Sequence, residues 1–554
     1  MKNINILIWV FTAFILNACG DNFLDLEPIT QKTDINFYSS PADAEEALVG
    51  CYDGLQLVWE GSGTMGDIAM PVAADVMSDL CFGGTGAVDP DNYAMIDEFD
   101  ENRAPGLLNV FEAEWTNYYK ALNRCNTLLL KIDQIDWGKD TIAQRRVEGE
   151  TRFLRAFLYF DMARMWERIP LLTEPSVENV PQEENPDKIY ELIAGDLLIA
   201  IENCNNLPYS KIAPTDFGHA NRWAAEGLLA RVYLYYTGYY GKTDLVGLVT
   251  QQNALDYLED AIKNSGYALL DNFADLWPAA ATYEAAKAGK PISKNTYAGE
   301  TNKEVVFAIK YTYTSNYDGN ADGNHWMVMN GLRKVSSPKY GYGNGWGACT
   351  VLPEVYADWD TTDDRREASI MAVAEEKIDF KTKDIKDVKE YTGYFTKKYI
   401  PTCDKDGNSI AQDIYGGVNF MLGQFQDYFS IRYADILLMA AELGSDNALK
   451  YVNDVHTRAG LDPLLAIDKD VIFEERRLEF AFEGIRYWDL LRYDNTLAYA
   501  ASKVTYTGKV LTNNIQIDKV IDGQNLIKTR GLFQIPYNQI TLTNNVLKQN
   551  PGWD

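Results

Sequence analysis

The residues whose types could do chemistry are most concentrated near the carboxyl end, in the stretch EERRLEFAFEGIRYWDLLRY at residues 474–493. This stretch holds five carboxylates, four arginines and a tryptophan. Paired carboxylates can act as acid and base in glycoside hydrolysis, but they must then face a cleft from opposite sides of the substrate. Whether these acids can do so depends on the element that carries them.

The periodicity of the stretch predicts scaffold and not a catalytic cleft. On a helix, its apolar residues fall on one side at steps of three or four, and opposite charges recur three residues apart. Gly484 predicts a tight junction between two short helices, because glycine within a helix costs about 1 kcal/mol relative to alanine. The apolar residues are Leu478, Phe482, Ile485, Trp488 and Leu491, and the expected charge pairs are Arg476–Glu479, Glu483–Arg486 and Asp489–Arg492.

The elements that position these residues belong to a chain of 554 residues with a net charge of −29. Such an acidic surface repels phosphate backbones and anionic lipid, so nucleic acid is excluded as an expected partner. The chain also carries 35 Tyr, 22 Phe and 12 Trp, more ring surface than a core needs. Part of this ring surface is therefore available for recognition of a ligand.

The first twenty residues predict an exported protein. Lys2 precedes a short apolar run from Ile4 to Leu16, which is too short for a bilayer span of about 20 residues and is typical of a cleaved signal peptide. The run ends in Leu-Asn-Ala-Cys, which resembles a bacterial lipobox with Cys19 as the acylated first residue of the mature chain. We expect a signal peptide at 1–18 and a lipid anchor on Cys19. The other six cysteines show no C-x-x-C spacing, and we expect buried free thiols.

Helical stripes separated by turns recur along most of the chain. They predict helices at 110–131, 142–167, 187–203, 220–238 and 252–264, and again at 432–443, 446–459, 469–483 and 485–493. Residues 266–430 are instead rich in Gly, Asn, Asp, Tyr and Trp, with strand-like runs such as EVVFAIKYTY. The predicted fold class is mainly α, with a tetratricopeptide-like scaffold of helical hairpins and an inserted, irregular, loop-rich subdomain that contains short strands.

Several motifs together resemble the SusD/RagB family of surface glycan-binding lipoproteins. The charged stretch at 474–493 is similar to the signature near the carboxyl end of that family. CGDNFLDLEP at 19–28 resembles its acidic start after the lipidated Cys, and the remaining motifs follow in the family's order over nearly the whole mature chain. These motifs are LNRCNTLLLKI, ETRFLRAFLYFDMARMWERIPLL, YELIAGDLLIAIENC, AAEGLLARVYLYY, IRYADILLMAAEL and IPYNQITLTNNVLKQNPGW.

The resemblance implies a protein of the outer membrane that is not an enzyme. Members of the family bind oligosaccharide and pass it to a SusC-like TonB-dependent transporter, which they cap as a hinged lid. The corresponding regions here would be an N-terminal helical region at 19–265, a loop-rich subdomain with the ligand loops at 266–430, and a C-terminal helical region at 431–554. Oligopeptide capture, known in the RagB branch, is the alternative function, and a surface glycoside hydrolase is a less favoured one.

Sugars present C–H faces to aromatic rings and hydroxyls to short polar side chains, so a binding site should combine both on loops. The segment 311–347 meets this description best, and its glycines at 341, 343, 345 and 347 are expected to let Tyr342 and Trp346 face outward. Residues 59–93 form a second candidate, and DDRREASI with Tyr394 and Tyr399 a third. The predicted ligand-binding residues are Trp326, Trp346, Tyr342, Tyr340, Tyr317, Asn324, Asp75, Asp79 and Phe82.

No cofactor is expected. The three histidines are far apart and lack zinc-site company, and no G-x-S-x-G or P-loop motif is present. A structural calcium ion is a weaker alternative. DGNADGNHWMVM begins like an EF-hand loop but has Met329 where Glu is required, and TCDKDGNSIAQD has Asp413 there but opens with Thr402.

Overall fold

The computed structural model describes residues 37–553 except for 61–67, 177, 292–295, 313, 315–321, 411–420 and 422. Helices dominate, which confirms the predicted fold class. The helices are α2 (Pro41–Glu60), α3 (Met70–Val76), α4 (Asn92–Asp97), α5 (Glu112–Lys131), α6 (Thr141–Trp166), α7 (Pro186–Asn203), α8 (Arg222–Tyr240), α9 (Gln251–Asn264), α10 (Pro278–Lys287), α11 (Pro353–Asp358), α12 (Asp364–Ser369), α13 (Thr382–Ile385), α15 (Tyr433–Glu442), α16 (Ala448–Arg458), α17 (Lys469–Glu479), α18 (Arg486–Arg492), α19 (Ala498–Val504), α20 (Gly523–Thr529) and α21 (Tyr537–Leu542).

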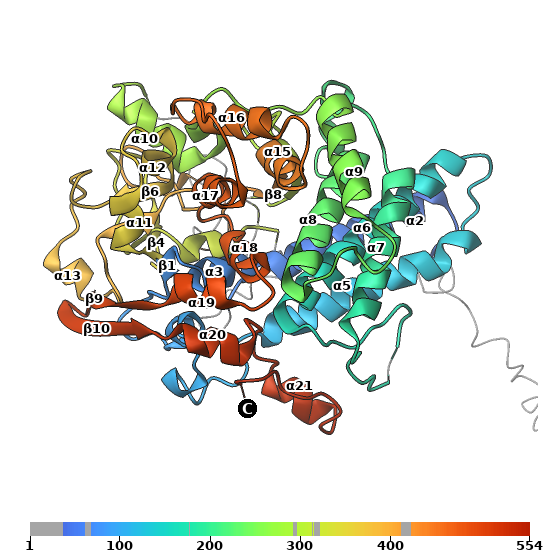
Figure 1. Ribbon diagram of the computed structural model, residues 1–554, viewed down its shortest axis with the longest axis horizontal. Helices are drawn as coiled ribbons and strands as arrows, with labels where there is room; N and C mark the ends of the chain where they lie inside the picture. The colour runs from blue at the N-terminus through green and yellow to red at the C-terminus, as the bar shows by residue number, and fades with distance from the viewer. Residues whose placement is uncertain are drawn as a thin grey trace, which may run out of the picture.

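Five consecutive helices form the stacked hairpins of the scaffold. Each helix from α5 to α8 packs against the next one in the chain, and α2 lies against α5 and α6 (Figure 1). Side-chain caps mark the starts of α6 and α8: Asp140 accepts the N–H of Ala143 at 3.0 Å, and Asn221 accepts that of Ala224 at 2.9 Å. The helices predicted from the apolar stripes at 110–264 are therefore all present, with ends that differ by one or two residues.

The loop-rich stretch leaves the scaffold after α9 and returns at α15, and these two helices pack against each other. Its strands are short. β5 (Thr350–Val351), β7 (Tyr394–Thr396) and β6 (Ile370–Ala372) form one sheet in that order, and β1 (Cys81–Phe82), from the N-terminal region, adds to it beside β5. β3 (Leu332–Arg333) pairs with β4 (Asn344–Gly345), and β2 (Val305–Ile309) pairs with β8 (Tyr428–Arg432). Part of this stretch has its own small core, which includes Tyr340 and Tyr342. The boundaries at 266 and 430 stay a prediction.

A long hairpin interrupts the C-terminal region that the sequence predicted to be helical. Strands β9 (Tyr506–Thr512) and β10 (Ile515–Ile521) pair antiparallel, and the turn residues Asn513 and Asn514 both have positive φ, at 56° and 64°. A tight two-residue hairpin turn requires positive φ at both of its central residues, and Asn adopts positive φ more readily than most residues. Lys519 fastens the hairpin to the body, because its buried ammonium contacts Asp97 at 2.9 Å and Glu390 at 2.8 Å.

The charged stretch at 474–493 forms α17 and α18, and Gly484 lies between them with φ 68°. This confirms the predicted junction. Phe482, Ile485, Trp488 and Leu491 are all buried, as the stripe predicted, while Leu478 is half-buried.

Two of the three expected charge pairs in this stretch are wrong. Arg476 contacts Asp435 at 2.6 Å and Asp489 at 2.9 Å instead of Glu479. Glu483 binds Lys398 and Arg432, and Arg486 binds Asp79. Only Asp489–Arg492 forms as expected, at 2.8 Å. The cause is burial: the helix is covered on several sides, so its charges are satisfied by residues from other elements and not by their own neighbours along the helix.

The six cysteines in the described part of the chain are buried and free, as predicted. In the same part of the chain, none of the helices is both long and apolar enough to cross a membrane.

Candidate ligand-binding pocket

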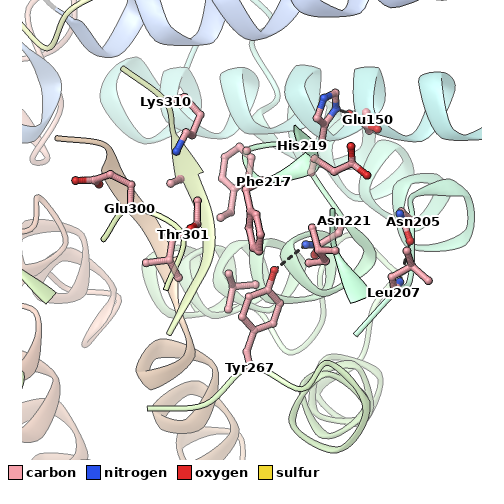
Figure 2. Close-up of a pocket in the computed structure, with 18 of the residues that line it drawn as sticks. Glu150, Asn205, Leu207, Phe217, His219, Asn221, Tyr267, Glu300, Thr301 and Lys310 are labelled. Carbon is pink, nitrogen blue, oxygen red and sulfur yellow. Dashed lines mark hydrogen bonds and ion pairs between the residues drawn. The ribbon is translucent and has the colours of Figure 1, made fainter. Parts of the chain in front are cut away.

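A pocket of about 280 Å³ opens where the starts of α2, α6 and α8 meet the segment that leads into β2 (Figure 2). It is lined by Glu45 from α2, by Arg146 and Glu150 from α6, by the loop that precedes α8, by Tyr267 after α9, and by residues 300–310. Loops and helix ends held by a rigid scaffold are the usual location of binding sites.

One wall is built around the Glu150 carboxylate, whose side chain is only 1% exposed. Arg146 Nη1 donates to it at 2.8 Å, the Tyr52 hydroxyl at 2.6 Å, and His219 Nδ1 lies 2.7 Å away. The hydrogen bond to Glu150 is the main cause of the raised pKa of His219. Tyr52 in turn accepts the N–H of Ala220 at 2.7 Å. This wall therefore fixes the loop before α8 against α6.

A second wall contains Glu300, which forms a carboxyl pair with the buried Asp427. Glu300 accepts the Asp427 N–H at 3.0 Å and the Tyr297 hydroxyl at 2.7 Å, while Asp427 binds Lys310 and the N–H of Tyr311. Burial, together with the negative charge of Asp427, raises the pKa of Glu300 to about 8, and burial raises that of Asp427 to about 6. At neutral pH the Glu300 carboxyl is therefore largely protonated and can donate as well as accept a hydrogen bond.

Aromatic rings complete the pocket. Figure 2 shows Phe217 and Tyr267 near its centre, with Tyr267 accepting a hydrogen bond from the Asn221 amide at 3.1 Å. The ring of Tyr209 lies beside both, with centroid distances of 5.7 Å to Phe217 and 5.3 Å to Tyr267. Phe217 is half-buried. The pocket thus offers a ring face next to amide, carboxyl and imidazole groups, which suits a ligand with both C–H faces and hydroxyls.

The structure places most of the predicted ligand-binding residues elsewhere. The expectation that Tyr342 faces outward is wrong: its side chain is fully buried and its hydroxyl donates to Glu376 at 2.9 Å. Trp326 is 2% exposed and packs on Tyr399 and Tyr428. Tyr340 and Asn324 are buried as well.

The glycines of this segment explain the difference, because they serve close packing of the backbone. A Cβ on Gly343 would lie 2.9 Å from the carbonyl carbon of Pro401, and one on Gly345 would lie 1.8 Å from the carbonyl oxygen of Asn330. Glycine is used where two chain segments approach this closely. Trp346 alone among the described rings of the predicted set remains half-buried.

The second predicted group, within residues 59–93, does not line the pocket. Its two aspartates instead connect α3 and the residues after it to Gly484 and α18. Asp75 accepts the N–H of Gly484 at 2.9 Å, and Asp79 is bound by Arg486 at 2.7 and 2.8 Å. Phe82 is fully buried beneath the hairpin. In the third group, Arg365 is fully buried in ion pairs. Tyr317 and Cys19 lie outside the described residues.

The calcium alternative gains no support from the described residues, in which no cluster of three or more His, Cys, Asp or Glu side chains is placed to hold a metal ion. In the second loop, Asp404 accepts the N–H groups of Asp406 and Asn408 at 2.8 and 2.9 Å, as in a tight turn. Asp413 and residues 318–321 of the first loop lie outside the described residues.

Sequence reasoning missed every residue of the pocket. Phe217 and His219 immediately precede the cap of α8, and Glu300 precedes β2, so the segments that meet here are more than 80 residues apart. The usable signal was the sequence FGHAN ahead of a helix, since in stacked antiparallel hairpins the loops before alternate helices, such as α6 and α8, lie at the same end.

Two family models match this chain. One, described as SusD family, matches residues 378–553, and the other, described as starch-binding associating with outer membrane, matches residues 92–234. A SusD-like protein of Bacteroides ovatus is 24% identical over 506 residues, which cover 88% of this chain and 82% of that protein. SusD-like protein P2 of Formosa agariphila is 24% identical and covers 87% of this chain and 89% of its own length.

Solved structures have the same fold. A laminarin binding SusD-like protein superposes with a TM-score of 0.70 at 25% identity, over 93% of this chain and 100% of that one. Surface glycan-binding protein A from Bacteroides thetaiotaomicron, in complex with laminarihexaose, gives a TM-score of 0.69 at 23% identity, over 92% of this chain and 100% of that one. At that identity the second likeness concerns the fold.

Proposed function

Because this chain belongs to the SusD/RagB family, we propose that it binds an oligosaccharide without cleaving it and delivers it to a SusC-like TonB-dependent transporter. The protein would be held at the cell surface by a lipid on Cys19. The observation that carries the proposal is the pocket in which Phe217 and Tyr267 stand beside hydrogen-bonding groups, in a fold shared with a protein named for binding laminarin.

The physical fit is that of a saccharide. A half-buried ring can stack on the C–H face of a sugar, and the neighbouring amide and carboxyl groups can bond its hydroxyls. A pocket of about 280 Å³ is large enough for one or two sugar rings, so the rest of an oligosaccharide would extend over the adjoining surface. The 311–347 loops, with Trp346 and Tyr317, remain the proposed location of further contacts.

Calorimetric titration of the protein lacking residues 1–19 tests the proposal. Laminarin and xyloglucan oligosaccharides are titrated first, followed by a wider panel, and each mixture is examined for hydrolysis products. Phe217→Ala should weaken binding by about fivefold or more, since stacked aromatic contacts contribute about 1 kcal/mol or more. Phe380→Ala is the matched control, because Phe380 is also half-buried but packs on Tyr391 and Phe395, away from the pocket.

The outcomes separate the alternatives. Binding of one glycan class without products, weakened in Phe217→Ala and kept in Phe380→Ala, supports the proposal. Release of shortened sugars would identify a hydrolase instead. If no glycan binds and cationic oligopeptides do, the result would favour peptide capture, with which the net charge of −29 is also compatible. Co-purification with a TonB-dependent transporter from the native membrane tests the partner.

A further inference from the structure

In the described part of the chain, the positively charged groups around the pocket all have ion-pair partners, whereas some of the acids do not. Each cation that lines it is already bound to a carboxylate: Arg146 to Glu45 and Glu150, and Lys310 to Asp427. His219 is bound to Glu150 in the same way. Among the described residues, each lining cation therefore already has a carboxylate partner when an anion enters the pocket.

Two of the carboxyl groups that line the pocket, those of Asp216 and Glu300, have no such partner among the described residues. Asp216 is exposed and accepts the hydroxyl of its neighbour Thr215 at 3.0 Å, and Glu300 is bound by a hydroxyl and a backbone N–H. Within the described chain, neither of these two acids forms an ion pair. A ligand entering the pocket therefore meets acids that are negatively charged or protonated, and cations that are already paired with carboxylates.

A negatively charged ligand would either share a cation with the carboxylate that already binds it, at the cost of repulsion between the two anions, or draw the cation away from that carboxylate. Lys310 would leave Asp427, whose side chain is 1% exposed, and Arg146 or His219 would leave Glu150, which is equally buried. Removing the partner of a buried charge is strongly unfavourable because the remaining ion keeps no water to replace it. A neutral sugar makes no such demand, since its hydroxyls can donate to Asp216 and can both donate to and accept from Glu300 and Asn221.

We infer that this pocket accepts uncharged sugar residues, or residues that carry an ammonium group, and excludes residues that carry a carboxylate. The inference rests on the proposed function, which it deepens by naming the charge class of the ligand. It predicts that uronic acid polysaccharides are not captured through this pocket.

Saturation-transfer NMR at pH 7 tests the inference with three small probes that share one ring: methyl glucoside, methyl glucosaminide and methyl glucuronide. The protein lacks residues 1–19, and ionic strength is matched. The first two probes should receive saturation that Phe217→Ala abolishes and Phe380→Ala retains. Methyl glucuronide should bind at least about tenfold more weakly than methyl glucoside.

A second variant keeps the test independent of pocket collapse. Asp216→Asn preserves the shape of the pocket and removes the negative charge of its exposed acid, so it should reduce the difference in affinity between methyl glucoside and methyl glucuronide several-fold. Equal or stronger binding of the glucuronide by the unaltered protein would overturn the inference. Absence of all three signals would also overturn it, whereas the oligosaccharide titration decides the proposed function separately.

Discussion

Replacing the Glu479 carboxylate by the amide of the same shape should destabilise the protein by about 3–5 kcal/mol, the usual cost of breaking a buried ion pair on one side. The Glu479 side chain is fully buried and contacts three arginines: Arg432 at 2.7 Å, Arg458 at 2.5 Å and Arg365 at 3.3 Å. Glu479→Gln keeps the volume but turns an amide toward these guanidinium groups. Chemical denaturation at pH 7, followed by tryptophan fluorescence, measures the change.

Glu474→Gln is the matched control on the same helix. The side chain of Glu474 is 53% exposed and pairs with Arg477 three residues away, a surface contact worth at most about 0.5–1 kcal/mol. A difference below about 1 kcal/mol between the two variants would refute the assignment of Glu479 as the centre of a buried network.

The pH dependence supplies an independent check. Burial opposes ionisation of Glu479, but Arg458, Arg432 and Arg365 together hold its pKa well below the usual range. A carboxyl with a lowered pKa contributes stability above its unfolded pKa of about 4.3, and that contribution is lost as the pH falls further. The gap between the unaltered protein and Glu479→Gln should stay constant from pH 7 to 5 and shrink below about pH 4. A gap that persists unchanged at pH 3 would contradict the electrostatic account.

Three further predictions concern folding. Burial raises the pKa of Asp75 to about 8, so the folded state holds a proton that the unfolded state releases above about pH 4. The stability of Asp75→Asn relative to the unaltered protein should therefore increase as the pH rises toward 8. The expected increase in the free energy of unfolding, measured by chemical denaturation, is on the order of 2–4 kcal/mol. Gly484→Ala should lower the free energy of unfolding by more than about 1 kcal/mol, because φ is 68° and the new Cβ would lie 3.1 Å from Pro71. Gly50→Ala is the control in α2: its Cβ would meet open space, and it should raise the free energy of unfolding by about 0.5–1 kcal/mol. Trp326→Ala should lower thermal stability by an equivalent of about 3–5 kcal/mol, as for a core tryptophan, and an unchanged melting temperature would show that the ring is not part of the core.

The helices of the scaffold could be predicted because their signal is local. A stripe repeating every three or four residues fixes a buried face within one element, and Gly484 marks a break without reference to any other residue. The ion pairs could not be predicted in the same way. The partners of Arg476, Glu483 and Arg486 come from elements that only the tertiary fold brings together, and spacing along a helix contains no information about them.

The binding site was harder to predict for a related reason. Ring density in a loop segment looks the same whether the rings face solvent or form a local core, and glycine is needed both for turns and for close backbone contacts. The Tyr342 ring belongs to a local core, and Gly345 permits a close backbone contact. The pocket, in contrast, takes single residues such as Phe217 and Glu300 from segments that carry no conspicuous composition.

The charged stretch and the pocket are nevertheless connected through one residue. Glu304 is fully buried and binds Arg432 at 2.7 Å and Arg458 at 3.0 Å, the two arginines that also hold Glu479. It immediately precedes β2, whose residues from Val305 to Ala308 line the pocket. The carboxylates and arginines that first suggested catalysis therefore act at a distance from any ligand: by satisfying one another in the interior, they fix the strand against which a ligand would lie.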